Sequence, residues 1–177
     1  MKMKKLLLCM AMGICVFCGC QKKEMEEAVA VAQEIICEDA GIVFQLNGLW
    51  EIDYDENQQD TKTVELWAKQ QETGANLLIF HEELEKIKTG DLLRLEDYIE
   101  SLKENLKIAE DYNYSLQETS QTILYGKSYY TFLATSPKMG ARQQYYIRKN
   151  EDKITTIVVT VYEDDSIREV LALGKKI

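Results

Sequence analysis

The chain has 177 residues, of which 30 are acidic and 21 are basic, so its formal net charge is −9. This acidic excess argues against binding to nucleic acid and against electrostatic docking on anionic lipid, because both partners are themselves negative. The length is typical of one domain that can bury a substantial core.

The first twenty residues have the anatomy of a secretory signal. A positive cluster occupies Met1–Lys5, an apolar segment runs from Leu6 to Phe17, and Cys18-Gly19-Cys20 follows. Positive residues, a short apolar run and small residues are the ordered parts of a signal peptide. The run from Leu6 to Cys20 has 15 residues, whereas a helix that crosses a bilayer needs about 20. A permanent transmembrane helix is therefore disfavoured.

Phe17-Cys18-Gly19-Cys20 resembles the lipobox of bacterial lipoproteins, in which an apolar residue and two small residues precede a cysteine. The resemblance implies that the Cys20 thiol receives a diacylglyceryl group, that residues 1–19 are removed, and that Cys20 becomes the first mature residue. A thiol is the most nucleophilic side chain available, and acyl chains contribute about 0.8 kcal/mol of anchoring per buried methylene. The expected location is the extracytoplasmic face of the cell membrane, with membrane lipid as a partner through Cys20. The alternative is an ordinary secreted protein.

Removal of residues 1–19 would take three lysines, which leaves 18 basic and 30 acidic residues and a net charge of −12. Of the five cysteines, Cys37 alone would keep a free thiol if Cys20 is lipidated. One thiol cannot form an internal disulfide, so the domain must be held together by its core. We expect Cys37 to be a small, partly buried hydrophobic residue.

The predicted elements begin with residues 20–40, a lipidated N-terminus and stalk. Met25, Val29, Ala32 and Ile36 are spaced to lie on one side of a helix, so a helix is predicted here. A strand through Val29-Ala30-Val31 is the alternative. A single domain is predicted over residues 41–177.

Extended segments open this domain. Asn47-Gly48 is a strong turn signal between two strand-like segments. The segment Lys62–Gln70 alternates, which predicts Val64, Leu66 and Ala68 on one face. The predicted elements are strands over Ile42–Leu46, Leu49–Tyr54, Lys62–Gln70 and Ala75–Phe80 and a helical turn over Glu82–Ile87.

The clearest helix is predicted over Leu92–Ile108. Its apolar stripe consists of Leu95, Tyr98, Ile99, Leu102 and Leu106, and its predicted water-facing residues are Glu96, Glu100, Lys103 and Glu104. Strands are predicted beyond it, and a closing helix, Asp165–Leu173, is expected to be capped by Asp164 and ended by Gly174. The predicted later strands are Tyr112–Leu116, Thr122–Tyr125, Lys127–Ala134, Gln143–Lys149 and Ile154–Tyr162.

Sequential strands interrupted by one long helix and closed by another predict an α+β domain with an antiparallel β-sheet flanked by helices. Over Gly41 to Leu173 the layout resembles the Mog1/PsbP-like fold, including the PsbP-related lipoproteins of bacteria. The resemblance implies a non-catalytic role, commonly as an accessory or assembly subunit, but it transfers no partner. The segments that carry the resemblance are Phe44–Trp50, Ala75–Ile79, Leu95–Ile99, Leu124–Tyr130, Gln143–Ile147 and Ile154–Tyr162.

Catalytic chemistry would have to use the single histidine, His81, with Ser128 or Ser136 as nucleophile. No Gly-x-Ser-x-Gly elbow is present, so we expect His81 to be a surface or satisfied residue. Zinc is disfavoured because His81 and Cys37 are the only soft ligands and carboxylates would have to supply the rest. The sequence predicts no catalytic residue, no cofactor and no metal ligand.

A weaker candidate is Asp53-Tyr54-Asp55-Glu56-Asn57. Asp53, Asp55 and Asn57 match positions 1, 3 and 5 of an EF-hand loop, but Gln58 and Val64 stand where the loop needs Gly and Glu. A solvated acidic loop is therefore expected.

Tyr129-Tyr130 and Tyr145-Tyr146 are adjacent pairs on predicted strands, so one member of each pair should point outward. Outward tyrosines can anchor a partner or pack across strands.

These observations predict a membrane-anchored, non-enzymatic binding or accessory module that acts through protein contacts with an unknown partner. The alternative is a lipoprotein that binds a small solute or Ca²⁺.

Overall fold

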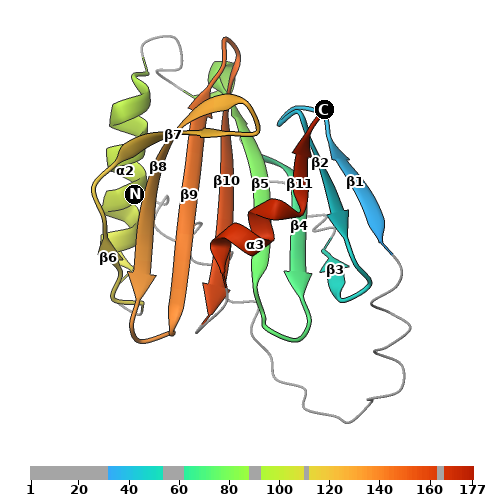
Figure 1. The fold of residues 1–177 in the computed structure, drawn as a ribbon. Coiled ribbons are helices and arrows are strands. Elements are labelled where there is room, and N and C mark those ends of the chain that lie inside the picture. Colours follow the sequence, from blue (N-terminus) through green and yellow to red (C-terminus); the bar gives the residue numbers. More distant parts are fainter. Residues whose placement is uncertain (1–31, 54–61, 88–92, 110–111, 163–165) are drawn as a thin grey trace.

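The structure is a computed structural model that describes residues 32–53, 62–87, 93–109, 112–162 and 166–177. An eight-stranded sheet has the order β3-β4-β5-β10-β9-β8-β6, with β7 also paired to β8, and a three-stranded sheet has the order β1-β2-β11 (Figure 1). The described strand pairs are antiparallel, which confirms the predicted α+β class. The strands are β1 (Gln33–Cys37), β2 (Ile42–Leu46), β3 (Trp50–Ile52), β4 (Lys62–Gln70), β5 (Asn76–Glu83), β6 (Ser115–Leu116), β7 (Ser120–Leu124), β8 (Lys127–Ser136), β9 (Ala141–Lys149), β10 (Lys153–Tyr162) and β11 (Gly174–Lys176).

Each face of the large sheet is covered by a different layer. Helix α2 (Leu95–Ile108) covers one face, and the small sheet with the short helix α3 (Ile167–Ala172) covers the other. We call the two apolar interiors the helix-side core and the sheet-side core. The helix-side core contains Phe80, Leu84, Ile99, Leu102, Leu106, Phe132, Ala134, Tyr145, Ile147, Ile154 and Val158. The sheet-side core contains Cys37, Ala40, Ile42, Phe44, Leu46, Trp50, Leu66, Ala68, Ala75, Leu77, Ile79, Tyr129, Ile157, Val159, Val161 and Val170.

Strand β10 explains why both faces need a cover. Its residues from Ile154 to Val161 are all buried, and successive side chains point to opposite faces. Val158 therefore lies in the helix-side core, and Ile157 and Val159 lie in the sheet-side core. A strand that is apolar on both faces can be stable only inside a three-layer arrangement.

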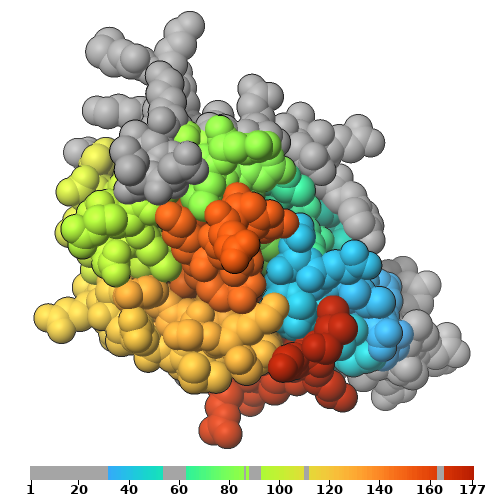
Figure 2. Space-filling model, turned by 90° about the horizontal axis from the view of Figure 1, so that it is seen from above, coloured from blue at the N-terminus to red at the C-terminus, as the bar shows by residue number. Residues whose placement is uncertain are grey.

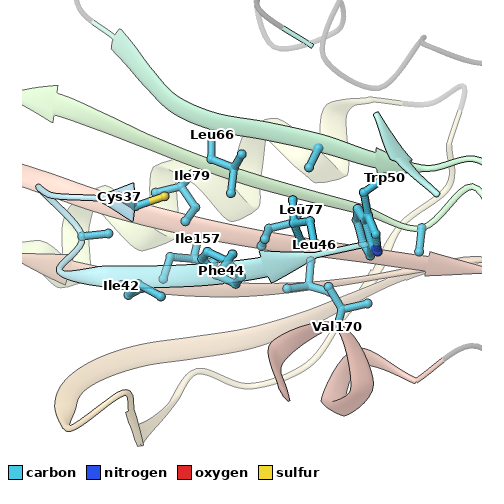
Figure 3. Packing of buried hydrophobic residues seen from close by; sticks show 14 of the residues in the cluster. Cys37, Ile42, Phe44, Leu46, Trp50, Leu66, Leu77, Ile79, Ile157 and Val170 are labelled. Atoms are coloured by element: carbon cyan, nitrogen blue, oxygen red, sulfur yellow. The ribbon is translucent and has the colours of Figure 1, made fainter. Parts of the chain in front are cut away.

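The small sheet joins the two ends of the described chain. Strand β2 pairs with β1 on one side and with β11 on the other, so Phe44 lies opposite both Ile35 and Gly174. Seen from above, the C-terminal segment lies against the N-terminal strands (Figure 2). In Figure 3 the side chains of β2 point toward β5 and β10, and Val170 of α3 closes the same cluster.

The predicted stalk helix is wrong over Gln33–Cys37, where the chain forms β1. Ile36, which the helical stripe placed on its packed side, is 57% exposed, and Cys37 is fully buried instead. The five-residue pairing with β2 overrides a helical spacing that had no partner to pack against. The domain therefore includes β1, so the predicted boundary near Gly41 falls within a hairpin. The alternative strand at Val29-Ala30-Val31 lies outside the described residues.

Three further predictions change in detail. Lys103 is buried rather than water-facing: its Nζ lies 5.7 Å from the Phe132 ring centroid and donates to the Thr119 hydroxyl at 3.3 Å. Gly174 lies directly after the end of α3, as predicted, but the chain continues there as a further strand, β11. Asp164 lies outside the described residues, and α3 begins after Ser166. The other long predicted elements are present, with boundaries that differ by a few residues.

Candidate functional site

The single histidine lies inside the molecule. His81, on β5, is 3% exposed and faces the small sheet. Its Nδ1 lies 3.0 Å from the hydroxyl of Thr155, which stands opposite it on β10, and its Nε2 lies 2.6 Å from Glu65 Oε2. Both ring nitrogens therefore have partners, which confirms that His81 is a satisfied residue and shows that it is not a surface one.

A β-bulge brings Glu65 to this histidine. Val64 pairs with Phe80 and Leu66 pairs with Ile79, so Glu65 is the extra residue of β4. A bulge reverses the alternation of side chains beyond it, and Val64 accordingly packs on the helix-side core while Leu66 lies in the sheet-side core. The prediction that Val64 shares a face with Leu66 and Ala68 is therefore wrong, because alternation cannot reveal a bulge.

Glu65 also connects the large sheet to the turn after β1. Its two carboxylate oxygens accept hydrogen bonds from the backbone N–H groups of Asp39, at 2.8 Å, and Ala40, at 3.1 Å. One side chain thus links β4, β5 and the β1–β2 turn. Hydrogen bonds to a charged acceptor are stronger than neutral ones, so this carboxylate helps to hold the small sheet in place.

Asp39 completes a group of three potential metal ligands. One donor atom each from Asp39, Glu65 and His81 lies within 4.8 Å of the others. Asp39 also accepts a hydrogen bond from Lys153 Nζ at 2.7 Å, and this bond lowers the pKa of the Asp39 carboxyl and raises the pKa of Lys153. The group passes from buried His81 through Glu65 to exposed Asp39.

Polar side chains continue from His81 across the large sheet. Thr155 on β10 lies opposite His81 on β5 and opposite Arg148 on β9. The register between β9 and β8 places Tyr129 beside Arg148. The Arg148 guanidinium carbon lies 5.8 Å from the Tyr129 ring centroid. Among the described residues, neither the Tyr129 hydroxyl nor Arg148 Nε has a hydrogen-bond partner, although both atoms are buried. We call Tyr129, Arg148, Thr155, His81 and Glu65 the polar row.

Neither of the two serines that hydrolytic chemistry would have needed is a hydrogen-bond partner of His81. Ser136 is fully buried and donates to the Tyr112 carbonyl, and Ser128 is exposed on β8. The hydroxyl that contacts His81 belongs to Thr155, which has no exposed surface. A nucleophile must reach a substrate atom, so the Thr155–His81–Glu65 arrangement cannot act as a hydrolytic triad in this conformation.

Cys37 is a buried free thiol, which confirms the prediction of a small hydrophobic role. Burial, with a smaller effect from the Glu65 carboxylate, raises the pKa of this thiol to about 12. A thiol that stays protonated is a poor nucleophile.

The tyrosine pairs are used for packing on both faces. Tyr129 and Tyr145 are buried, and their neighbours Tyr146 and Tyr130 are half-buried against the sheet-side and helix-side cores, respectively. Tyr145 stacks on Phe132 with ring centroids 4.6 Å apart. The half-buried members therefore contribute to cross-strand packing.

The predicted lipidation site and most of the weak calcium candidate lie beyond the described residues. Of the calcium candidates, Asp53 is described and exposed, but Asp55 and Asn57 are not described. Cys20 is likewise outside the described residues. Within the part of the chain that is described, no helix has the length and apolarity needed to span a bilayer.

Sequence signals could not have found Glu65 or Asp39. Neither residue belongs to a motif, and each lies far from His81 along the chain. The bulge in β4 and the docking of the β1–β2 turn bring them together, and both are tertiary features.

No protein-family profile matches the chain, and no curated protein matches it in sequence. Among solved structures it is similar to the solution structure of the cyanobacterial PsbP protein CyanoP from Synechocystis sp. PCC 6803. The TM-score is 0.57 at 16% sequence identity, over 94% of this chain and 99% of that one. At this identity the similarity concerns the fold alone. The chain has a PsbP-like fold, with an antiparallel sheet and two described α-helices.

Proposed function

We propose that this chain is a lipoprotein, attached through Cys20 to the extracytoplasmic face of the cell membrane, whose PsbP-like domain is a non-enzymatic accessory module. The observation that carries the proposal is the signal-like segment that ends in Phe17-Cys18-Gly19-Cys20. Lipidation of Cys20 would tether a domain whose first described strand begins at Gln33, thirteen positions later. Such a linker spans at most about 45 Å, so the domain would act close to the membrane.

Two features of the domain support an accessory role. Both faces of the large sheet are covered by packed layers. A partner would therefore contact the outer surfaces of these layers or the edges of the sheets. The one histidine–hydroxyl arrangement is closed to solvent, because Thr155 is fully buried. The 16% identity to CyanoP transfers no partner, so the partner must be found by experiment.

The anchor can be tested by feeding cells an alkyne fatty acid and measuring the label and intact mass of the full chain. The wild-type chain should carry the label and lack residues 1–19. Cys20→Ser should lose the label, and the matched control Cys18→Ser should keep it. A mature chain that retains residues 1–19, or that carries no fatty acid, would contradict the anchoring proposal.

The accessory role can be tested by placing a photocrosslinking residue at exposed apolar positions of the chain in intact cells. The same protein partner should be captured reproducibly from at least one position, and competition with the unmodified chain should reduce the capture. The four positions are Ile36, Ile108, Ile123 and Ile177, which are 57%, 61%, 70% and 62% exposed. Failure to capture a partner at all four would count against action through protein contacts.

A further inference from the structure

We propose that Asp39, Glu65 and His81 bind one divalent transition-metal ion of the zinc class, and that the ion connects the β1–β2 turn to the large sheet. Imidazole nitrogen and carboxylate oxygen are both zinc ligands, and three protein ligands with a fourth position for water is the coordination of an open zinc site. The three residues come from the turn after β1, the bulge in β4 and strand β5. The site would therefore join segments that are distant in sequence.

The distances suit such an ion after small side-chain rotations. Ligand atoms around a tetrahedral ion with bonds of about 2.1 Å lie about 3.4 Å apart. His81 Nε2 and Glu65 Oε2 are 2.6 Å apart, a distance at which a proton joins them, and the whole trio lies within 4.8 Å. In the metal-bound form the ring proton lies on Nδ1 and is donated to Thr155, so the ion takes the place of the proton between Nε2 and Glu65, and these two atoms move apart by less than 1 Å. Asp39 lies on the exposed side of the trio, which gives the ion a path from solvent.

His81 is already oriented as a metal ligand. Histidines that bind metals usually form a hydrogen bond through the other ring nitrogen, which fixes the ring and its tautomer. Thr155 contacts His81 Nδ1 at 3.0 Å, which leaves Nε2 directed at Glu65. The backbone N–H groups of Asp39 and Ala40 hold the Glu65 carboxylate in the same way.

A separate observation concerns a buried hydroxyl on the same face of the large sheet. Tyr129 is 1% exposed, yet its hydroxyl has no hydrogen-bond partner among the described residues. Buried hydroxyls are nearly always paired. Tyr129 lies in the polar row on the same face as His81. Burial raises the pKa of the Tyr129 hydroxyl, nearby Arg148 lowers it and the Glu65 carboxylate raises it. This hydroxyl is therefore available to a water or other ligand that enters the polar row.

Lys153 provides a sharp test because it competes with the ion. Its ammonium bonds Asp39 Oδ1 at 2.7 Å, and a divalent ion would compete with it for the Asp39 carboxylate. The side chain of Lys153 is 20% exposed, so the ammonium can turn toward solvent. Removal of this charge should strengthen metal binding, whereas a purely structural ion pair would give no such result.

The experiment uses the full chain, purified in detergent without a histidine tag, stripped with chelator and titrated with Co²⁺ and Zn²⁺. We expect one Co²⁺ per chain, a visible absorption band of four- or five-coordinate cobalt, and displacement by Zn²⁺. No thiolate charge-transfer band is expected, and Cys37→Ser should bind like the wild type. The melting temperature should rise with metal concentration, because the ion binds only the folded chain.

The variants separate the proposal from adventitious binding. His81→Asn and Glu65→Gln should weaken binding by roughly 100-fold or more, because loss of an outer partner alone costs about 10–100-fold. Thr155→Val should weaken it by roughly 10-fold, and Lys153→Met should tighten it at least roughly threefold, on the Coulomb scale of a nearby exposed charge. If His81→Asn does not fold, the Lys153 and Thr155 variants decide the matter. No stoichiometric binding, or binding that Lys153→Met and Thr155→Val leave unchanged, would overturn the proposal.

Discussion

The two layers that cover the large sheet are built in opposite ways. Helix α2 is a single run of 14 residues that carries its own apolar stripe. The other layer combines β1 and β2 near residue 40 with α3 and β11 beyond residue 166. Local segments can form on their own periodicity, whereas a non-local layer must first close a long loop of chain. Because the segments of the sheet-side layer are held by one another and by the large sheet, we expect this layer to be the more sensitive to changes where they meet, and four experiments can test this comparison.

The largest effect is expected for Phe44→Ala. Phe44, on β2, is fully buried in the sheet-side core, where its ring packs edge-on against Tyr125 and its backbone pairs with Gly174. Loss of a buried phenylalanine ring costs about 3–5 kcal/mol of unfolding free energy, which urea unfolding can measure. Leu102→Ala on α2 is the matched change in the other layer, with about 2–5 kcal/mol expected. Separate transitions in the Phe44 variant would show that the small sheet can detach while the rest stays folded.

Gly174→Ala tests the close contact between β11 and β2, where Gly174 pairs with Phe44. A Cβ at this glycine would lie 2.5 Å from the Tyr125 hydroxyl and 2.8 Å from a Phe44 ring carbon. Overpacking of this kind costs about 1–3 kcal/mol. The exposed neighbour Lys175, changed to Ala, should alter the unfolding free energy by less than about 0.5 kcal/mol. Equal stability of the two variants would contradict the tight contact.

Alkaline pH should weaken the helix-side layer through Tyr145. Burial raises the pKa of Tyr145 far above its ordinary value of 10.0, so the stability that its neutral hydroxyl contributes is fully present below pH 10. That stability is lost as pH rises from 10 toward the folded-state pKa, by about 1.4 kcal/mol per pH unit. Tyr145→Phe should show a shallower loss of unfolding free energy between pH 10 and 11. Parallel curves for the two proteins would disprove this assignment.

The smallest effect is expected for Glu65→Gln in the metal-free chain. The amide keeps an acceptor for one backbone N–H but loses the charge-assisted bond to His81, which should cost about 1 kcal/mol. Hydrogen exchange should accelerate at the Asp39 and Ala40 amides and stay unchanged in α2. The exposed Glu104→Gln is the control. Acceleration that spreads equally to both layers would remove the distinction between them.

Much of the fold could be predicted because its signals are local. The stripe of α2 and the apolar runs of β5 and β10 appear directly in the sequence and are confirmed. The predictions failed where a distant partner decided the outcome. Gln33–Cys37 is a strand because β2 pairs with it, and Lys103 is buried because Phe132 lies beneath its ammonium.

By itself the sequence determined the α+β class, the one long helix and the apolar runs that form β5 and β10, since each depends on the kind and spacing of residues along a short segment. Only the tertiary structure decided the sheet-side layer and the Asp39–Glu65–His81 group. Backbone pairing across more than a hundred residues forms the layer, and the one-residue bulge at Glu65 directs its carboxylate to His81. Neither feature produces a periodic pattern in the sequence. A bulge exists only relative to the strand that pairs with it, and the small sheet forms only when β11 from the C-terminal part of the chain pairs with β2.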